Sequence, residues 1–230
     1  MMKRRTILSV LLGLALLSSC AKEAAENIWE NGSNGGFGET QDFTAIVTVH
    51  KSPTDTVYFQ VDDTTRLFPY NFQRDYNKME RIVCGITVSS SKVPNYGYQT
   101  YVQWYDQLDK GTFSNTKPSG ANDGLDIISD WMTSCEDGFL TLHYSTRWGL
   151  ASVPHTFTLV AGQNPSDPYE VLLVQDSNGD EKKQTADSVV YFDINSLPDT
   201  GDTYETLTLK WTDSGGKTAE KEFRFKTRKP

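Results

Sequence analysis

The sequence has three histidines, His50, His143 and His155, and histidine is a common zinc ligand. His143 and His155 fall on strands that we expect to be neighbours in one sheet, so a two-histidine metal site is the first chemistry to consider. Pairing Leu140 with Leu159 keeps the apolar faces of these strands together, and it leaves the two histidines out of register. We therefore predict no metal site and no cofactor.

An acidic segment, residues 176–181 (DSNGDE), has the composition of a calcium-binding loop. Such a loop needs glycine at its sixth position and a bidentate acid at its twelfth. Counted from Asp176, glycine is fourth and the twelfth residue is Asp187. A hairpin turn with Asn178-Gly179 at its tip explains the same residues more simply.

Signals for covalent catalysis are weak. The sequence has no G-x-S-x-G motif, and neither Cys84 nor Cys135 has a histidine close by in sequence. The chain has 30 acidic residues, so some carboxyl groups will lie close together by chance, and spacing alone cannot assign a glycosidase pair. The acids considered are Asp126, Asp130, Asp137, Asp167, Asp176 and Asp180. We predict that the protein is not an enzyme.

Aromatic residues are concentrated in one stretch, at Tyr96, Tyr98, Tyr101, Trp104 and Tyr105. Exposed rings on a small β-barrel can stack on sugars or on unpaired bases. The alternation of an undisturbed strand places Trp104 on the face opposite Tyr101 and Tyr105. A structural role, with Trp104 in the core, is therefore the simpler interpretation, and Tyr98, Tyr101 and Tyr105 are kept as candidate binding residues.

The N-terminus has the arrangement of a secretory signal. A basic start, Lys3-Arg4-Arg5, precedes the largely apolar run Ile7–Leu17, which is well short of the roughly 20 residues that a membrane-spanning helix needs. The ending Leu17-Ser18-Ser19-Cys20 resembles the bacterial lipobox, in which the cysteine thiol is acylated. We expect residues 1–19 to be a lipoprotein signal peptide and Cys20 to be the lipid attachment residue that anchors the protein in a membrane.

The mature chain is acidic. Without residues 1–19 it keeps 19 basic residues against 30 acidic ones, a net charge of −11. Nucleic-acid binding relies on clustered lysine and arginine, so nucleic acid is not an expected partner.

Two cysteines remain besides Cys20. Exported proteins can form disulfides, and Cys84 could pair with Cys135. The two are 51 positions apart and one of them falls inside a predicted strand, so we favour two separate thiols.

The mature chain divides by composition. Residues 20–41 are rich in glycine, asparagine and glutamate, which predicts a flexible linker after the lipid anchor with a reach of about 25 Å. Residues 42–118 contain short alternating stretches that indicate a small barrel or curled sheet. The predicted strands of this domain are Phe43–Val49, Thr56–Val61, Arg81–Ser89 and Gln99–Tyr105.

A run of turn-forming residues near 114–124 separates this region from a second β domain, residues 123–230. Seven short strands separated by turn signals are typical of an immunoglobulin-like β-sandwich. These strands are Leu125–Trp131, Gly138–Thr146, His155–Ala161, Tyr169–Gln175, Ser188–Ile194, Glu205–Thr212 and Lys221–Thr227. The predicted fold class is all-β.

Several segments in this order resemble the NigD-like lipoproteins of Bacteroidota. They include DFTAIVTVHKSPTDTVYFQVDDTTRLFP, RIVCGITV, YQTYVQWYDQL, DGLDIISDWMTSCEDGFLTLHYSTRWG and VVYFDINSLP. The resemblance covers essentially the whole mature chain and implies an N-terminal OB-type barrel followed by a C-terminal β-sandwich. It also suggests a link to bacteriocin immunity, but it carries no catalytic residues. One departure is Thr64 after Asp62-Asp63, where we expect glycine.

These observations predict an outer-membrane lipoprotein of the cell envelope, facing either the periplasm or the cell surface. We expect a non-catalytic binding or interaction module with a protein or glycan partner. The alternative is a glycan-binding or glycan-processing envelope protein.

Overall fold

The computed structural model describes residues 40–52, 56–72, 79–93, 97–120, 122–149, 153–181 and 183–229. The chain forms two compact units that divide between Gln107 and Leu108. The described residues are all β-strands, turns and loops, and none of them forms a helix long and apolar enough to cross a bilayer.

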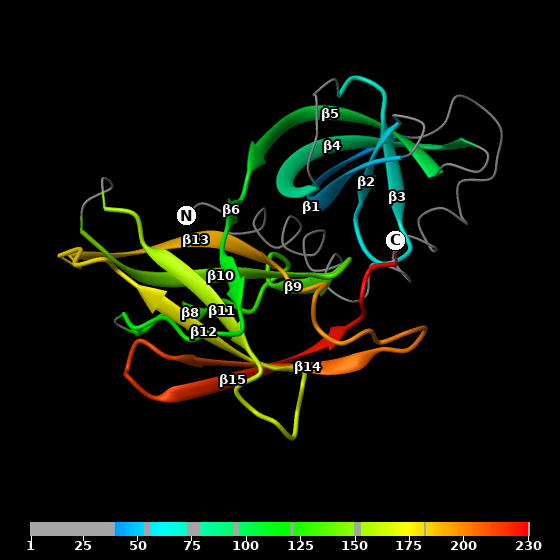
Figure 1. Cartoon of the computed structure of the whole chain (residues 1–230). Helices are drawn as coiled ribbons and strands as arrows, with labels where there is room; N and C mark the ends of the chain where they lie inside the picture. Colours follow the sequence, from blue (N-terminus) through cyan, green and yellow to red (C-terminus); the bar gives the residue numbers. More distant parts are fainter. Residues whose placement is uncertain are drawn as a thin grey trace, which may run out of the picture. The chain divides into compact units, whose positions relative to one another are not determined.

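The first unit is a closed five-stranded barrel (Figure 1). Its strands are β1 (Thr40–Lys51), β2 (Val57–Gln60), β3 (Arg66–Pro69), β4 (Glu80–Val93) and β5 (Gly97–Gln107). They pair in the order β1-β2-β3-β5-β4, and β4 returns to β1 to close the barrel. Only the β3–β5 pairing is parallel. This arrangement is the OB-type barrel that the family resemblance implies.

The barrel core follows from alternation along the strands. Ala45, Val47 and Val49 of β1 point inward, together with one face of β4. That face consists of Ile82, Cys84, Ile86 and Val88. The alternation of apolar and polar residues did not predict β3. This strand is only four residues long and lies after the acidic turn at Asp62.

The acidic turn connects β2 to β3. The Asp62 carboxylate accepts hydrogen bonds from the backbone nitrogens and the hydroxyl groups of both Thr64 and Thr65, at 2.7–2.9 Å. Short polar side chains stabilise tight turns in this way, so the turn forms without the glycine expected at position 64.

The second unit is a sandwich of two five-stranded sheets (Figure 1). Its strands are β6 (Asp109–Lys110), β7 (Thr112–Ser114), β8 (Asp126–Ile127), β9 (Ser134–Glu136), β10 (Phe139–Trp148), β11 (Thr156–Ala161), β12 (Glu170–Asp176), β13 (Gln184–Asp193), β14 (Glu205–Thr212) and β15 (Thr218–Phe225). One sheet has the order β6-β13-β10-β8, with β9 also on β10, and the other has the order β15-β14-β12-β11-β7.

All seven strands predicted for the sandwich are present in part or in full, and β6, β7 and β9 are additional. The core lies between the sheets, where Leu142 and Phe192 of one sheet belong to the same buried cluster as Leu159 and Leu209 of the other.

The division between the units differs from the predicted domain ranges 42–118 and 123–230. β6 pairs with β13 and β7 pairs with β11, so residues 109–114 belong to the sandwich. The barrel also begins earlier, because Thr40 and Gln41 of the predicted linker already lie in β1. The described residues of the turn-forming run near 114–124 belong to the sandwich and do not connect the two domains.

Gly111 marks the point where the chain passes from one sheet to the other. Its N–H donates to the carbonyl of Tyr191 at 2.8 Å, which completes the pairing of β6 with β13. A Cβ atom at this position would lie 2.1 Å from Cε1 of the buried Phe192 ring, so only glycine fits without displacement.

The Asn178-Gly179 turn forms, but it does not close a hairpin. Both residues have positive φ, as a type I′ turn requires, and the Asp180 N–H donates to the Ser177 carbonyl. The prediction of a hairpin was wrong, because the flanking strands β12 and β13 belong to different sheets.

Candidate functional site

The strands that carry His143 and His155 are not neighbours in one sheet. His143 lies on β10, which pairs with β13, whereas His155 immediately precedes β11, which pairs with β12. The predicted pairing of Leu140 with Leu159 was therefore wrong, since each of these leucines contributes to the core from its own sheet. The two histidines form separate polar clusters.

His143 bridges two carboxylates. Its Nδ1 lies 2.7 Å from Asp130 Oδ2, and its Nε2 lies 3.0 Å from Asp187 Oδ2. The hydrogen bond from His143 is the main reason that the pKa of Asp187 lies below its ordinary value. This arrangement ties the turn after β8 to the edge of β13.

His155 lies in a buried network. Its Nε2 is 3.1 Å from Asp180 Oδ2, its Nδ1 is 2.8 Å from Gln175 Nε2, and its ring stacks on Trp148 with centroids 3.8 Å apart. Asp180 also accepts hydrogen bonds from the N–H groups of Gly149 and Glu181. These contacts occupy both ring nitrogens of His155, and its ring is stacked on Trp148. The network therefore holds the ends of β10, β11 and β12 together.

The acidic 176–181 segment uses its carboxylates in the same way. Asp180 is committed to the His155 network, and Asp176 Oδ1 accepts the Asn178 N–H at 2.8 Å. Within the described residues, no group of three or more potential ligands is placed to hold a metal ion.

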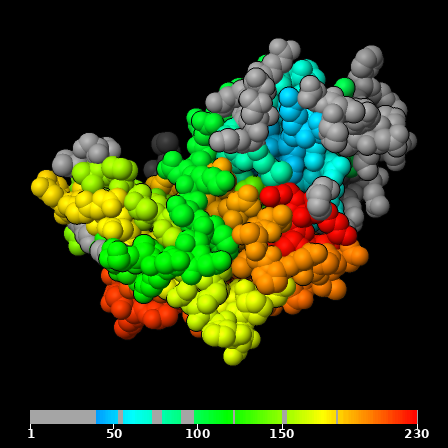
Figure 2. Space-filling model, in the orientation of Figure 1, coloured from blue at the N-terminus to red at the C-terminus, as the bar shows by residue number. Residues whose placement is uncertain are grey.

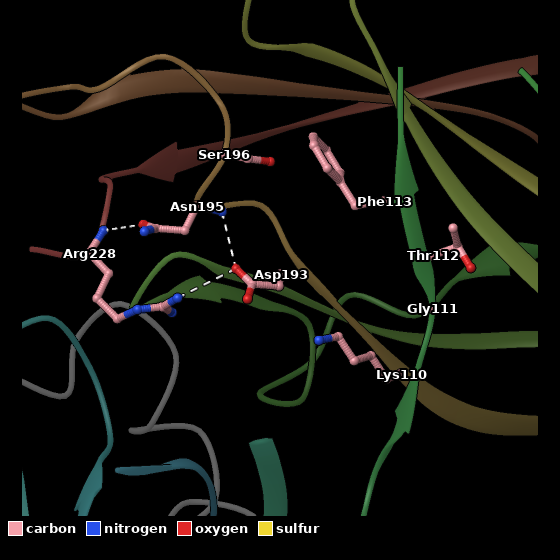
Figure 3. A pocket seen from close by; sticks show the side chains of 8 residues that line it. All are labelled: Lys110, Gly111, Thr112, Phe113, Asp193, Asn195, Ser196 and Arg228. Carbon is pink, nitrogen blue, oxygen red and sulfur yellow. Dashed lines mark hydrogen bonds and ion pairs between the residues drawn. The ribbon is translucent and has the colours of Figure 1, made fainter. Parts of the chain in front are cut away.

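A surface hollow of about 600 Å³ lies beside the strand switch, the point at Gly111 where the chain passes from β6 in one sheet to β7 in the other (Figure 3). Lys110, Thr112, Phe113, Asp193, Ser196 and Arg228 are among its lining residues. The Arg228 guanidinium donates to the Asp137 carbonyl at 2.6 Å, lies 3.5 Å from Asp193, and packs over the Phe139 ring. Because Arg228 is already satisfied by these groups, it joins the C-terminal residues to the end of β13 and is not poised to bind a ligand.

A second hollow of about 660 Å³ shares Asn195 and Arg228 with the first. Figure 2 shows the orange residues around position 200 beside the red C-terminal residues on this face. Hydrogen bonds from Gly201 and Thr227 lower the pKa of Asp199, and the Lys229 ammonium lowers the pKa of Asp202. Both acids are therefore ionised near neutral pH, whereas a glycosidase acid needs a raised pKa.

The outer surface of the barrel presents a cluster of exposed aromatic side chains. Trp104 is 46% exposed and Tyr101 is 44% exposed, so the prediction that Trp104 lies in the core was wrong. The reason is a β-bulge in β5: Trp104 is opposite Gly85 and Val102 is opposite Ile86, which leaves Gln103 as an extra residue.

The bulge resets the alternation of β5 and places Tyr101 and Trp104 on the same face. Their partners on β4, Thr87 and Gly85, lie between the inward residues and therefore point outward. Gly85 and Thr87 are two positions apart along β4, so the residues opposite them, Trp104 and Tyr101, lie about 7 Å from each other. Tyr70, which is 66% exposed, extends this aromatic face, with its ring centroid 5.8 Å from that of Tyr101.

The candidate tyrosines do not all belong to this face. Tyr105 is 38% exposed, but it is opposite the inward Cys84, and its ring packs edge-on against Phe72 at the barrel core. Tyr98 is half-buried and packs against the same core. Tyr96 lies outside the described residues. Sequence reasoning missed Trp104 and Tyr70; the signal available for Trp104 was Gly85 in the middle of a β-strand, which often marks a bulge or a close approach.

A polar cluster lies beside the aromatic face. Asp42 Oδ1 accepts hydrogen bonds from the Thr87 hydroxyl at 2.6 Å and from the Gln103 amide at 3.0 Å. Gln103 also donates to the Thr87 hydroxyl at 2.8 Å. These three side chains come from β1, β4 and β5, and the bulge brings Gln103 to the outer surface.

The three cysteines lie in different parts of the chain. Cys20, the predicted lipid attachment residue, lies outside the described residues, as do the predicted signal peptide and nearly all of the linker. Cys84 and Cys135 do not form a disulfide with each other, and one lies in each unit. Burial raises the pKa of Cys84 to about 12, so it is not a nucleophile near neutral pH.

Solved structures from Bacteroidota share this fold. A protein from Parabacteroides distasonis, provisionally described as toxin-related, is 21% identical with a TM-score of 0.64, over 81% of this chain and 94% of that one. A NigD-like immunity protein from Bacteroides caccae is 16% identical with a TM-score of 0.55, over 78% and 91% of the two chains. A protein of unknown function from Bacteroides vulgatus is 16% identical with a TM-score of 0.64, over 80% and 90%.

No curated protein sequence matches the chain. The model of the NigD-like C-terminal beta sandwich domain matches residues 109–225, which include nearly all of the observed sandwich and begin at β6. The chain therefore belongs to the NigD-like family.

Proposed function

We propose that the protein is a non-catalytic binding module, anchored at the cell envelope through a lipid on Cys20. We further propose that the aromatic face of its barrel contacts the partner. The observation that carries this proposal is the exposure of Tyr70, Tyr101 and Trp104 on one side of the barrel. Large aromatic side chains exposed as a group are typical of interaction sites.

Four of the described carboxyl groups are poorly suited to acid catalysis. The pKa lies below its ordinary value for Glu170, Asp187, Asp199 and Asp202. A general acid at neutral pH needs a raised pKa. None of these four acids is therefore suited to be the general acid that glycan processing needs.

The family supports the same class of function. The solved relative from Bacteroides caccae is described as an immunity protein. Immunity against a bacteriocin would be one form of partner binding at the envelope.

Photo-crosslinking in intact cells tests the proposal. A benzoylphenylalanine residue replaces Tyr101 in one variant and Tyr204 in a control, since Tyr204 is an exposed tyrosine of the sandwich. We expect an irradiation-dependent adduct from position 101 and none from position 204. Adducts from position 204 alone, or from neither position, would refute the aromatic face as the contact surface.

A further inference from the structure

Trp104 lies flat on the outer surface of the barrel. A Cβ atom built on Gly85 would be 2.2 Å from Nε1 of the indole, 2.6 Å from Cε2 and 2.8 Å from Cδ1. These distances place the Cβ position over one face of the indole, close to Nε1, and not in the plane of the ring. Gly85 thus supports one face of the indole from below, while 46% of the residue remains accessible to solvent.

The polar cluster beside Trp104 contains hydrogen-bond acceptors that are not used within the cluster. Both side-chain hydrogen bonds of Asp42 use Oδ1, and Gln103 donates through Nε2 only. Among the described residues, Asp42 Oδ2 and Gln103 Oε1 have no partner, so both remain available as acceptors. A flat aromatic surface next to carboxylate and amide acceptors fits a ligand with an apolar face and hydroxyl groups along its edge.

Charge narrows the class of ligand. The side chains of this face, Tyr70, Tyr101, Gln103, Trp104, Thr87 and Asp42, include one anion and no cation. Nucleic acids and other polyanions need basic contacts, and the mature chain carries a net charge of −11. A neutral sugar satisfies both conditions, because the C–H face of a pyranose stacks on an aromatic ring and its hydroxyl groups donate to acceptors.

We infer that the aromatic face of the barrel binds a neutral glycan, with a pyranose ring stacked on Trp104 and hydroxyl groups bonded to Asp42 and Gln103. The inference rests on the proposed binding function and names the chemistry of the partner. Tyr101 borders the stacked sugar, and Tyr70 extends the surface toward a second residue of the glycan.

Affinity electrophoresis of the soluble Cys20→Ala form of the full-length chain tests this inference. The gels contain neutral polysaccharides, namely a mixed-linkage β-glucan, a galactomannan, a xyloglucan and dextran, or the polyanions polygalacturonate and heparin. We expect retardation by at least one neutral polysaccharide and by neither polyanion. Trp104→Ala should lower the affinity at least tenfold, because stacking on the ring is lost, whereas Tyr204→Ala should leave it unchanged.

Two further variants separate binding from folding. Trp104→Phe keeps an aromatic ring and should retain part of the affinity, and Asp42→Asn keeps an acceptor oxygen and should weaken binding less than Asp42→Ala. Circular dichroism checks that each variant is folded. Migration that is unaffected by all neutral polysaccharides, retardation by polyanions only, or equal retardation of Trp104→Ala and the parent would overturn the glycan inference.

The outcome is distinct from that of the crosslinking experiment. A protein adduct from position 101 without retardation by any neutral polysaccharide would overturn the glycan inference and leave the binding function in place. Absence of any adduct from position 101, together with unaffected migration, would overturn both.

Discussion

At the scale of single residues, Gln103 has the largest consequence for function. It is the extra residue of the bulge in β5, and it brings Trp104 and Tyr101 to the same face. A strict period of two predicts the opposite, because one inserted residue reverses the alternation of all that follow it. The candidate surface is therefore created by a local backbone irregularity.

Asp62 should contribute measurably to barrel stability. Replacing it with alanine removes the acceptor of four hydrogen bonds in the β2–β3 turn, and we expect a loss of about 1–2 kcal/mol in the free energy of unfolding. Asp62→Asn keeps one acceptor oxygen and should be milder. Urea unfolding followed by hydrogen exchange of the barrel strands measures both. Equal stability of the alanine variant and the parent would contradict this role of the turn.

The Asp187–His143 contact should depend on pH. Since the pKa of Asp187 is lower in the folded chain, its contribution to stability is present above the unfolded pKa of about 3.9 and is lost as pH falls through the folded pKa. We expect His143→Gln to raise the pKa of Asp187 back toward its ordinary value. Carbon-13 NMR titration of the Asp187 carboxyl group measures the change, and an unaltered pKa would show that the histidine is not its cause.

At the scale of elements, the strand switch from β6 to β7 defines where the sandwich begins. Together the two strands contain only five residues, yet they pair with the edges of both sheets. Such short strands show no period in the sequence, and the turn-forming residues near 114–124 gave a stronger but misleading boundary signal. The boundary is set by the pairing of β6 with β13 and of β7 with β11. These pairings join residues that are far apart in the sequence.

Gly111→Ala should destabilise the sandwich. The added methyl group would meet the buried Phe192 ring, and overpacking of a core costs about 1–3 kcal/mol. Gly215→Ala is a suitable control, because its closest neighbour is Asp213 Oδ1 at 3.2 Å. Hydrogen exchange of β11 and β13 during urea unfolding reports the loss. Similar midpoints for the two variants would mean that the ring moves aside at little cost.

At the scale of the whole molecule, the proposed tether and the binding surface lie at the N-terminal end of the chain. The barrel begins at Thr40, twenty positions after Cys20. The predicted linker has a typical reach of about 25 Å, so on that prediction a lipid on Cys20 would hold the barrel close to the membrane. This placement suits a protein that binds a component of the envelope.

Cys20→Ala should release the protein from the membrane. Acyl chains contribute about 0.8 kcal/mol for each buried CH₂ group, so several chains on one residue anchor the protein firmly against salt. We expect the unsubstituted protein to fractionate with membranes in high salt and to require detergent for extraction, whereas the variant stays in the soluble fraction. Release of the unsubstituted protein by high salt alone would contradict lipid anchoring.

Local sequence patterns were sufficient to predict the fold class and most of the strands. Alternation located the strand Arg81–Ser89, which lies within β4, and spaced turn signals located the seven main strands of the sandwich, because both depend on neighbouring residues. The predicted lipid site at Cys20 likewise rests on local sequence.

The pairing of the strands and the contacts between side chains became known from the folded structure. It placed His143 and His155 in different sheets and Trp104 on the outside of the barrel. Strand pairing and the position of a bulge depend on contacts between residues distant in sequence. The alternation of apolar and polar residues within one strand does not reveal these contacts. The aromatic face is therefore a property of the folded barrel.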